Sequence, residues 1–270
     1  MGHMREIFGK VLIFTLLASF FCLNSALAMS NETETAIGRG VNAKVVKKYG
    51  IFQNPDVQKY VEHIGLKIVS ASDRQDIVYH FTILNSSAIN SISVPGGYVY
   101  LTKGMLLKLE NEAQLAAALA TEIVHIAKRH GIIDIEEAMK SETPAVITKK
   151  DALDNGINAA FQMAEAGSVK AQQTEADIKG AEYLLRAGYD PKAMIKFLDV
   201  IQIAEKQKLF SIVDFIRMHR KTTKRIDAVW RMLHDLKVAD PAKFDAATDK
   251  FYPDSYKENV LMPLTAESAK

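Results

Sequence analysis

Residues 111–131, NEAQLAAALATEIVHIAKRHG, constrain the fold more than any other segment because they carry the signals of one long buried helix. Asn111 and the glutamine three residues later have the spacing of a capping box, and Gly131 follows a basic cluster at the other end. Because a helix turns by about 100° per residue, Glu122 and His125 fall within its apolar stripe. A buried carboxylate needs a partner. The stripe therefore predicts a metal site, an ion pair or a structural Glu–His pair.

The composition is that of an ordinary globular protein. The chain has 270 residues, of which 48% are hydrophobic and 24% charged, with a formal net charge of +2. This balance offers no strongly basic surface, and no RNA-binding or DNA-binding motif is present. We therefore expect no nucleic-acid partner, and a chain of this length is sufficient for one large domain.

The amino terminus has the pattern of a secretory signal peptide over residues 1–28, with residues 1–3 resembling a cloning remnant. Arg5 and Lys10 precede an apolar run, which ends before a small-x-small cleavage site at 26–28. A membrane-spanning helix is the alternative, but a run of about 13 residues falls short of the roughly 20 that a span needs. We expect export to the periplasm, with no stable transmembrane segment after cleavage.

The only cysteine, Cys22, lies inside this leader and follows Phe21, whereas lipoprotein processing requires a small residue at that position. Lipidation is not expected, and the mature chain would contain no cysteine. An exported protein without disulfides must depend on its hydrophobic core, which a domain of this size can supply.

Periodicity predicts an α+β, mainly helical fold with one domain over residues 29–237. Helical spacing covers 35–73, two or three strands of a small mixed sheet follow in 78–101, and further helices are expected at 156–166, 169–187, after Asp190-Pro191, and across RIDAVWRMLHDL with Trp230 in the core. Residues 132–155 show no clear period and suit a flap over a cleft or a surface loop. Residues 238–270 are expected to form a loosely ordered tail.

Four blocks carry a specific resemblance: AINSISVPGGYVYLTKGML, ENEAQLAAALATEIVHIAKRHG, QTEADIKGAEYLLRAGYDP and MHRKTTKRIDAV. In order and spacing they resemble the HtpX-like and Oma-like zinc metallopeptidases, metallopeptidase family 48, over most of residues 35–237. NPDVQKYVEHIGLKI also looks like the lead-in helix of exported members. The resemblance implies a gluzincin-like metallopeptidase fold over 29–237 with an active-site helix and a catalytic zinc ion.

The resemblance also assigns the site residues. In that family, both histidines of H-E-x-x-H and a downstream glutamate hold zinc. Here Thr121 and His125 occupy the histidine positions, Glu122 that of the general base and Gln173 that of the third ligand, with Asp177 as the acid that supports the first histidine. Two of the three ligands are thus replaced by neutral oxygen donors. We expect zinc binding to be weak or absent and hydrolysis to be impaired.

Three other ionisable residues could complete such a site. Glu175 begins a row of charges spaced like a solvated, ion-paired helix face, so it is not expected to substitute for Gln173. His219 lies where exported members carry a histidine near the metal or the oxyanion, although Arg220 replaces the usual proline. His130 is expected to compensate the helix dipole rather than to bind metal.

The segment around the second strand is unchanged from the family pattern. The resemblance places YVYLT beside the cleft, where it would pair with an extended chain, and assigns substrate binding to Pro95, Gly96, Gly97, Tyr98, Val99 and Tyr100. One hypothesis is therefore a chaperone-like or regulatory pseudopeptidase that binds unfolded polypeptide or other envelope proteins. The alternative is a working zinc metalloendopeptidase in envelope protein quality control, completed by His125, His219 and further residues that the sequence does not identify. The strand could also be kept only because the fold needs it.

Overall fold

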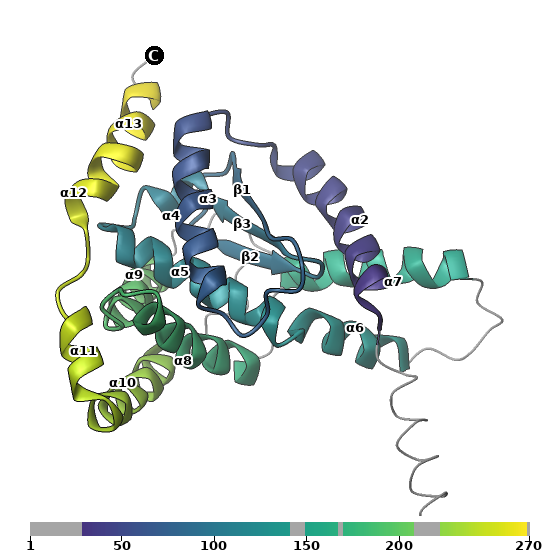
Figure 1. The fold of residues 1–270 in the computed structure, drawn as a ribbon. Coiled ribbons are helices and arrows are strands. Elements are labelled where there is room, and N and C mark those ends of the chain that lie inside the picture. Colours follow the sequence, from purple (N-terminus) through teal and green to yellow (C-terminus); the bar gives the residue numbers. More distant parts are fainter. Residues whose placement is uncertain (1–28, 141–148, 167–169, 208–221, 269–270) are drawn as a thin grey trace, which may run out of the picture.

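A computed structural model describes residues 29–140, 149–166, 170–207 and 222–268 (Figure 1). The expected signal peptide and His219 lie outside these residues. None of the described helices is both long and apolar enough to cross a membrane.

The described chain confirms the predicted α+β, mainly helical fold with a small mixed sheet. Two helices, α2 (Asn31–Tyr49) and α3 (Pro55–Ser70), precede the strands β1 (His80–Leu84), β2 (Ser91–Val94) and β3 (Tyr98–Thr102). The remaining elements are α4 (Lys103–Leu106), α5 (Glu112–Ala127), α6 (His130–Lys140), α7 (Lys149–Ala166), α8 (Lys170–Arg186), α9 (Ala193–Gln207), α10 (Thr222–Ala239), α11 (Pro241–Ala247), α12 (Pro253–Tyr256), the π-helix η1 (Lys257–Leu261) and α13 (Met262–Ser268).

The sheet has the order β1-β3-β2, with β3 parallel to β1 and antiparallel to β2. The expectation that YVYLT offers a free edge is therefore wrong, because neighbouring strands occupy both sides of β3. The reason is its composition: four of its five residues are buried, which suits a central strand. Among the described strands, β1 and β2 form the two edges of the sheet, and the outer side of β1 carries an isolated bridge between Leu84 and Ile51.

Side chains alternate between two hydrophobic clusters, one on each face of the sheet. Val99 and Leu101 join the cluster that contains α3 and α5, whereas Ile92 and Val94 join the cluster that contains α2 and residues of α6 and α7. The predicted turn at Pro95-Gly96-Gly97 connects β2 to β3. Gly97 has a φ of 92°, and a Cβ there would lie 2.1 Å from the Val78 carbonyl oxygen, so only glycine fits.

The helix α5 lies at the centre of the larger cluster. Its predicted start is confirmed, because Gln114 N donates to Asn111 Oδ1 at 2.9 Å and Gln114 Oε1 accepts from Glu110 N at 2.6 Å. Its end differs from the prediction: α5 stops at Ala127, and the chain turns through Arg129, whose φ is 56°, before α6 starts. Gly131 therefore belongs to the first turn of α6 and does not terminate α5.

Two segments are more regular than the sequence pattern suggested. The described parts of 132–155 form α6 and the start of α7, so the expected loop is wrong there; Ile132 and Ile135 are buried at helical spacing against α2 and β2. The expected loose tail instead forms helices over most of 241–268. Tyr256 lies in the larger cluster, and its hydroxyl donates to Leu106 O at 2.6 Å.

Trp230, predicted to be in the core, is 49% exposed on α10. The buried face of that helix is formed by Val229 and Leu233, which lie four residues apart in the larger cluster. Trp230 directly follows Val229, so it is rotated off this face by about 100°.

Candidate functional site

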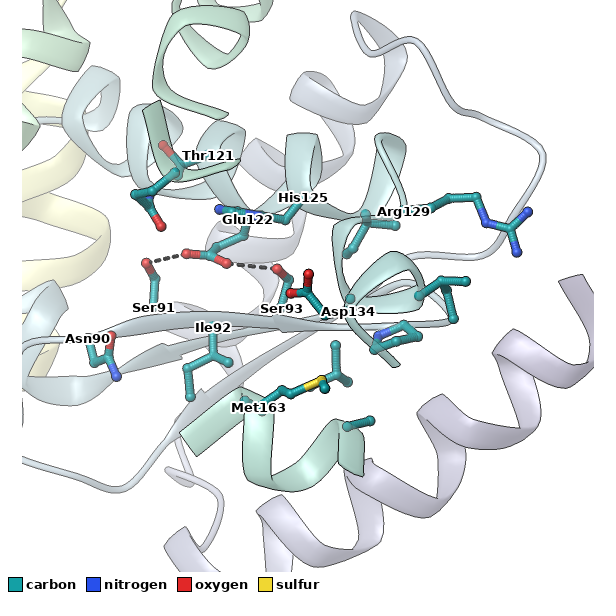
Figure 2. Close-up of a pocket in the computed structure, with 18 of the residues that line it drawn as sticks. Asn90, Ser91, Ile92, Ser93, Thr121, Glu122, His125, Arg129, Asp134 and Met163 are labelled. Atoms are coloured by element: carbon teal, nitrogen blue, oxygen red, sulfur yellow. Dashed lines mark hydrogen bonds between the residues drawn. The ribbon is translucent and has the colours of Figure 1, made fainter. Parts of the chain in front are cut away.

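A pocket lies along β2, where the strand faces α5, with walls from α6, α7, α8 and α10 (Figure 2). It brings together Thr121, Glu122, His125 and Gln173, the four positions that the resemblance assigned to the metal and the base. Pro95 lines one part of it, but Gly96, Gly97, Tyr98, Val99 and Tyr100 are not among its lining residues. The strand that borders the pocket is β2 rather than β3.

Glu122 is held by two serines of β2. Ser91 Oγ donates to Glu122 Oε1 and Ser93 Oγ donates to Oε2, each at 2.8 Å (Figure 2). Alternate residues of a strand share a face, so this spacing directs both hydroxyls toward α5. Burial raises the pKa of Glu122, and the two hydroxyl groups oppose that rise. Both carboxylate oxygens thus already have donors within the protein.

His125 is 5% exposed and surrounded by partners. Its Nδ1 lies 2.9 Å from His130 Nδ1, and Gln173 hydrogen-bonds its ring. Burial, with a smaller contribution from His130, lowers the pKa of His125 to about 3, and the bond from Gln173 opposes this shift. The imidazole is therefore neutral at physiological pH, and two positions that would both bind zinc in the family pattern contact each other.

The expected role of His130 at a helix C-terminus is wrong, because α5 ends at Ala127 and His130 is the first residue of α6. It is 4% exposed, contacts His125, and its Nε2 lies 3.3 Å from Glu175 Oε2. Burial lowers the pKa of His130, although the nearby Glu175 carboxylate opposes the shift. Glu175 itself is half-exposed, and the row of ion pairs expected on its helix continues from Lys179 to Glu182 at 2.7 Å.

The Thr121 hydroxyl bonds the backbone of its own helix. Its side chain is buried, with Oγ1 donating to Ala117 O at 3.2 Å and lying 3.7 Å from Met194 Sδ. A threonine hydroxyl inside a helix commonly bonds the carbonyl four residues earlier. The hydroxyl is thus committed to the helix backbone.

Asp177 forms a buried ion pair with Arg225. Arg225 Nε donates to Oδ2 at 2.6 Å and Nη2 donates to Oδ1 at 2.9 Å, and the two side chains are 0% and 4% exposed. The acid expected to support a first histidine therefore holds a guanidinium. Arg225 also lines the pocket, and its Nη1 has no hydrogen-bond partner among the described residues.

The described residues do not fit a catalytic zinc ion. Such a site needs three firm protein ligands and an open position for water. The pocket supplies one neutral imidazole, a carboxylate bound by two serines, and the neutral oxygens of Thr121 and Gln173. Within the described ranges, no group of three His, Cys, Asp or Glu side chains lies close enough together to hold a metal ion.

Sequence reasoning missed Ser91, Ser93 and Arg225 as parts of this site. The serines had a signal, since their spacing of two in a strand next to an apolar alternation places both on one face. Arg225 had none, because a basic residue near the start of an amphipathic helix is ordinarily solvated. Only its pairing with Asp177, 48 positions away, explains its burial.

Comparison with known proteins supports one family. The profile of peptidase family M48 matches residues 55–233. The beta-barrel assembly-enhancing protease of Escherichia coli (strain K12) is 25% identical over an alignment of 224 residues, which covers 70% of this chain and 45% of the relative. The putative beta-barrel assembly-enhancing protease of Vibrio cholerae is 28% identical over 161 residues, covering 54% and 33%. The mitochondrial metalloendopeptidase OMA1 of Schizosaccharomyces pombe is 24% identical over 217 residues, covering 78% and 64%. The chain spans less than half the length of the two bacterial relatives.

Proposed function

The chain belongs to peptidase family M48, and from that premise we propose that it is an exported, catalytically impaired member that binds extended polypeptide without cutting it. One observation carries this proposal: the side chains at the altered ligand positions have other partners. Thr121 bonds its own helix and Gln173 bonds His125. Zinc, if it binds, would have to break these contacts and would gain only neutral donors, so binding should be weak or absent.

The loss of zinc would remove the chemistry of hydrolysis. Water bound to a catalytic zinc has a pKa near 7, whereas free water has a pKa of about 15.7. Glu122 alone cannot generate a useful nucleophile from free water, and its two oxygens already accept bonds from Ser91 and Ser93. The pocket retains its shape and its polar lining without the means to activate water.

Polypeptide binding is supported by the edge of β2. Antiparallel pairs alternate between hydrogen-bonded and open positions, and Thr102 N bonds Asn90 O at 3.0 Å, which makes position 90 a bonded position. By alternation, Ser91 and Ser93 direct their backbone groups away from β3. An extended chain could pair with these groups and continue the sheet into the pocket.

We place this activity in the periplasm, because residues 1–28 have the pattern of a leader and two of the similar proteins are bacterial proteases named for beta-barrel assembly. The clients would be extended or unfolded envelope polypeptides, and the role would be chaperone-like or regulatory. The alternative is an active zinc metalloendopeptidase of envelope quality control. It is favoured by the retention of Glu122 and His125 at the motif positions, and it requires His219 together with at least one further residue as replacement ligands.

Zinc content separates the two functions. Elemental mass spectrometry on tag-free protein, purified without chelator and dialysed, should find zinc near zero, together with no cleavage of casein. Stoichiometric zinc with casein cleavage would establish the endopeptidase instead. The variant Thr121→His with Gln173→Glu should gain zinc, and adding Glu122→Gln to it should remove any cleavage that the double variant gains.

Binding has a matched pair of variants at Ser93. Both Ser93→Ala and Ser93→Pro lose the hydroxyl that bonds Glu122, but only proline removes the outward backbone N–H, and edge positions tolerate proline. Fluorescence anisotropy with fluorescein-labelled casein should show weaker binding for Ser93→Pro than for Ser93→Ala. Equal affinity of the two variants would refute pairing of the polypeptide with the edge of β2.

A further inference from the structure

We propose that Arg225 binds a backbone carbonyl oxygen of the polypeptide in the pocket, through the N–H groups of its Nη1. This inference rests on the polypeptide-binding function proposed above. It adds a side-chain contact from Arg225 to the backbone pairing proposed for β2. Arg225 would be a binding residue and not a catalytic one.

Asp177 leaves some of the hydrogen-bond donors of Arg225 unused. A guanidinium is planar and presents five N–H donors in a fixed arrangement. Asp177 accepts from Nε and Nη2, so one edge of the group is fixed against a fully buried carboxylate. Nη1 lies at the corner away from that carboxylate and has no partner in the described part of the chain.

An unused donor at this depth requires explanation. Arg225 is 3% exposed, and buried polar groups in native proteins nearly always have a hydrogen-bond partner. Neither of these neighbouring groups bonds Nη1: the Glu122 oxygens accept from Ser91 and Ser93, and the Thr121 hydroxyl donates to the helix backbone. The pocket offers a place from which an acceptor can reach this group, because Arg225 is one of its lining residues.

The charges of the pocket favour a neutral acceptor over an anion. Arg225 is already neutralised by Asp177. Glu34 pairs with Arg74 at 2.9 Å and with Arg129, a further lining residue, at 3.2 Å. Glu122 and Asp134 also line the pocket. Glu122 accepts hydrogen bonds from two serine hydroxyls, and Asp134 accepts one from the Gln172 amide, so neither acid is hydrogen-bonded to a cation in these contacts. These two acids would repel a carboxylate ligand, because like charges repel. A peptide carbonyl accepts the same N–H groups without adding charge.

Position supports the same conclusion. Arg225 lines the same pocket as Glu122 and His125 of α5 and as the β2 residues 91–94. A chain paired with the edge of β2 would therefore pass Arg225. One buried carbonyl bonded to Nη1 would fix the register of the chain, while pairing with β2 would supply sequence-independent binding.

The test must separate the lost donor from a lost ion pair. Arg225→Met alone would leave Asp177 buried and unpaired, so it is combined with Asp177→Leu, which replaces the pair by apolar side chains. Affinity for fluorescein-labelled casein, measured by anisotropy, should fall about 10-fold or more, as expected for a hydrogen bond from a charged donor. Arg225→Lys is the second variant: it keeps a cation beside Asp177, but one ammonium cannot replace both edges of the guanidinium, so binding should also weaken.

The outcomes are distinct. Wild-type protein that fails to bind casein would refute the polypeptide-binding function, and this inference with it. Wild-type protein that binds, with folded Asp177→Leu/Arg225→Met and Arg225→Lys variants that bind equally well, would refute only the role of Arg225. A casein-derived peptide should bind alike as free acid and as C-terminal amide. Loss of binding on amidation would identify a terminal carboxylate as the ligand and overturn the carbonyl assignment.

Discussion

Acid should destabilise this fold through His125. The folded pKa of this residue is about 3, against 6.5 for an ordinary histidine, because the ring is buried beside His130. Between these two pKa values the ring is protonated in the unfolded chain and neutral in the folded chain. The contribution of the neutral His125 ring to stability is therefore complete above pH 6.5, and it is lost as the pH falls from 6.5 toward 3.

The magnitude follows from the interval that is crossed. Between about pH 8 and about pH 4.5, only the unfolded state takes up the proton, over two pH units below its pKa of 6.5. At about 1.36 kcal/mol per unit, the free energy of unfolding should fall by about 2.7 kcal/mol from this residue alone. Glu122 acts in the opposite direction, because its raised pKa favours the folded state on acidification.

Urea unfolding of wild type and His125→Gln across this pH range, with EDTA present, isolates the contribution. Glutamine retains an amide that can bond Gln173 but does not titrate, so the difference in unfolding free energy between the two proteins should change by about 2.7 kcal/mol. His234→Gln, on an exposed side chain, serves as the control and should run parallel to wild type. Parallel curves for His125→Gln would refute the assignment of a buried neutral imidazole.

Three further predictions concern buried polar groups. Glu122→Gln should raise the free energy of unfolding at about pH 8, where burial disfavours the ionised acid, and this gain should shrink as the pH falls to about 4; urea midpoints at both values test this. Asp177→Asn should lower stability by about 3–5 kcal/mol, because it leaves the Arg225 charge buried without a counterion, whereas Asp177→Leu with Arg225→Met should recover most of that loss in the same assay. Tyr256→Phe should cost about 1–2 kcal/mol, because the Leu106 carbonyl loses its donor, and an unchanged midpoint would show that the C-terminal helices do not depend on this contact.

The sequence was most informative where one helix carried several agreeing signals. Asn111 capped α5 as predicted, and the apolar stripe placed Glu122 and His125 in one pocket because helical periodicity fixes which residues share a face. The position of Gln173 was predicted from the family resemblance. It lies on α8, where Gly180 packs against Ala120 of α5 and a Cβ added at Gly180 would lie 2.8 Å from Met194 Cε. Local pattern and packing agreed at these positions.

The same reasoning failed where long-range pairing decides. Nothing local distinguishes a central strand from an edge strand when both are short, so YVYLT was assigned an edge that β2 holds. The tail failed for another reason: Tyr256 and the two residues that bury with it, Val260 and Leu264, repeat every four positions, a helical signal that its prolines and short elements obscured.

The polar groups of the pocket form a consistent set once their partners are considered together. A catalytic metal site keeps its ligands oriented toward the ion, whereas here Thr121 bonds its helix, Glu122 bonds two serines, His125 bonds neighbouring side chains and Asp177 bonds Arg225. Each of these bonds would have to break or shift before zinc could reorganise the site. The two ligand replacements are therefore not isolated losses in an otherwise waiting centre. Among the described residues most polar atoms of this site have partners within it, and the unpartnered Nη1 of Arg225 supports the proposal that the pocket holds a chain without cutting it.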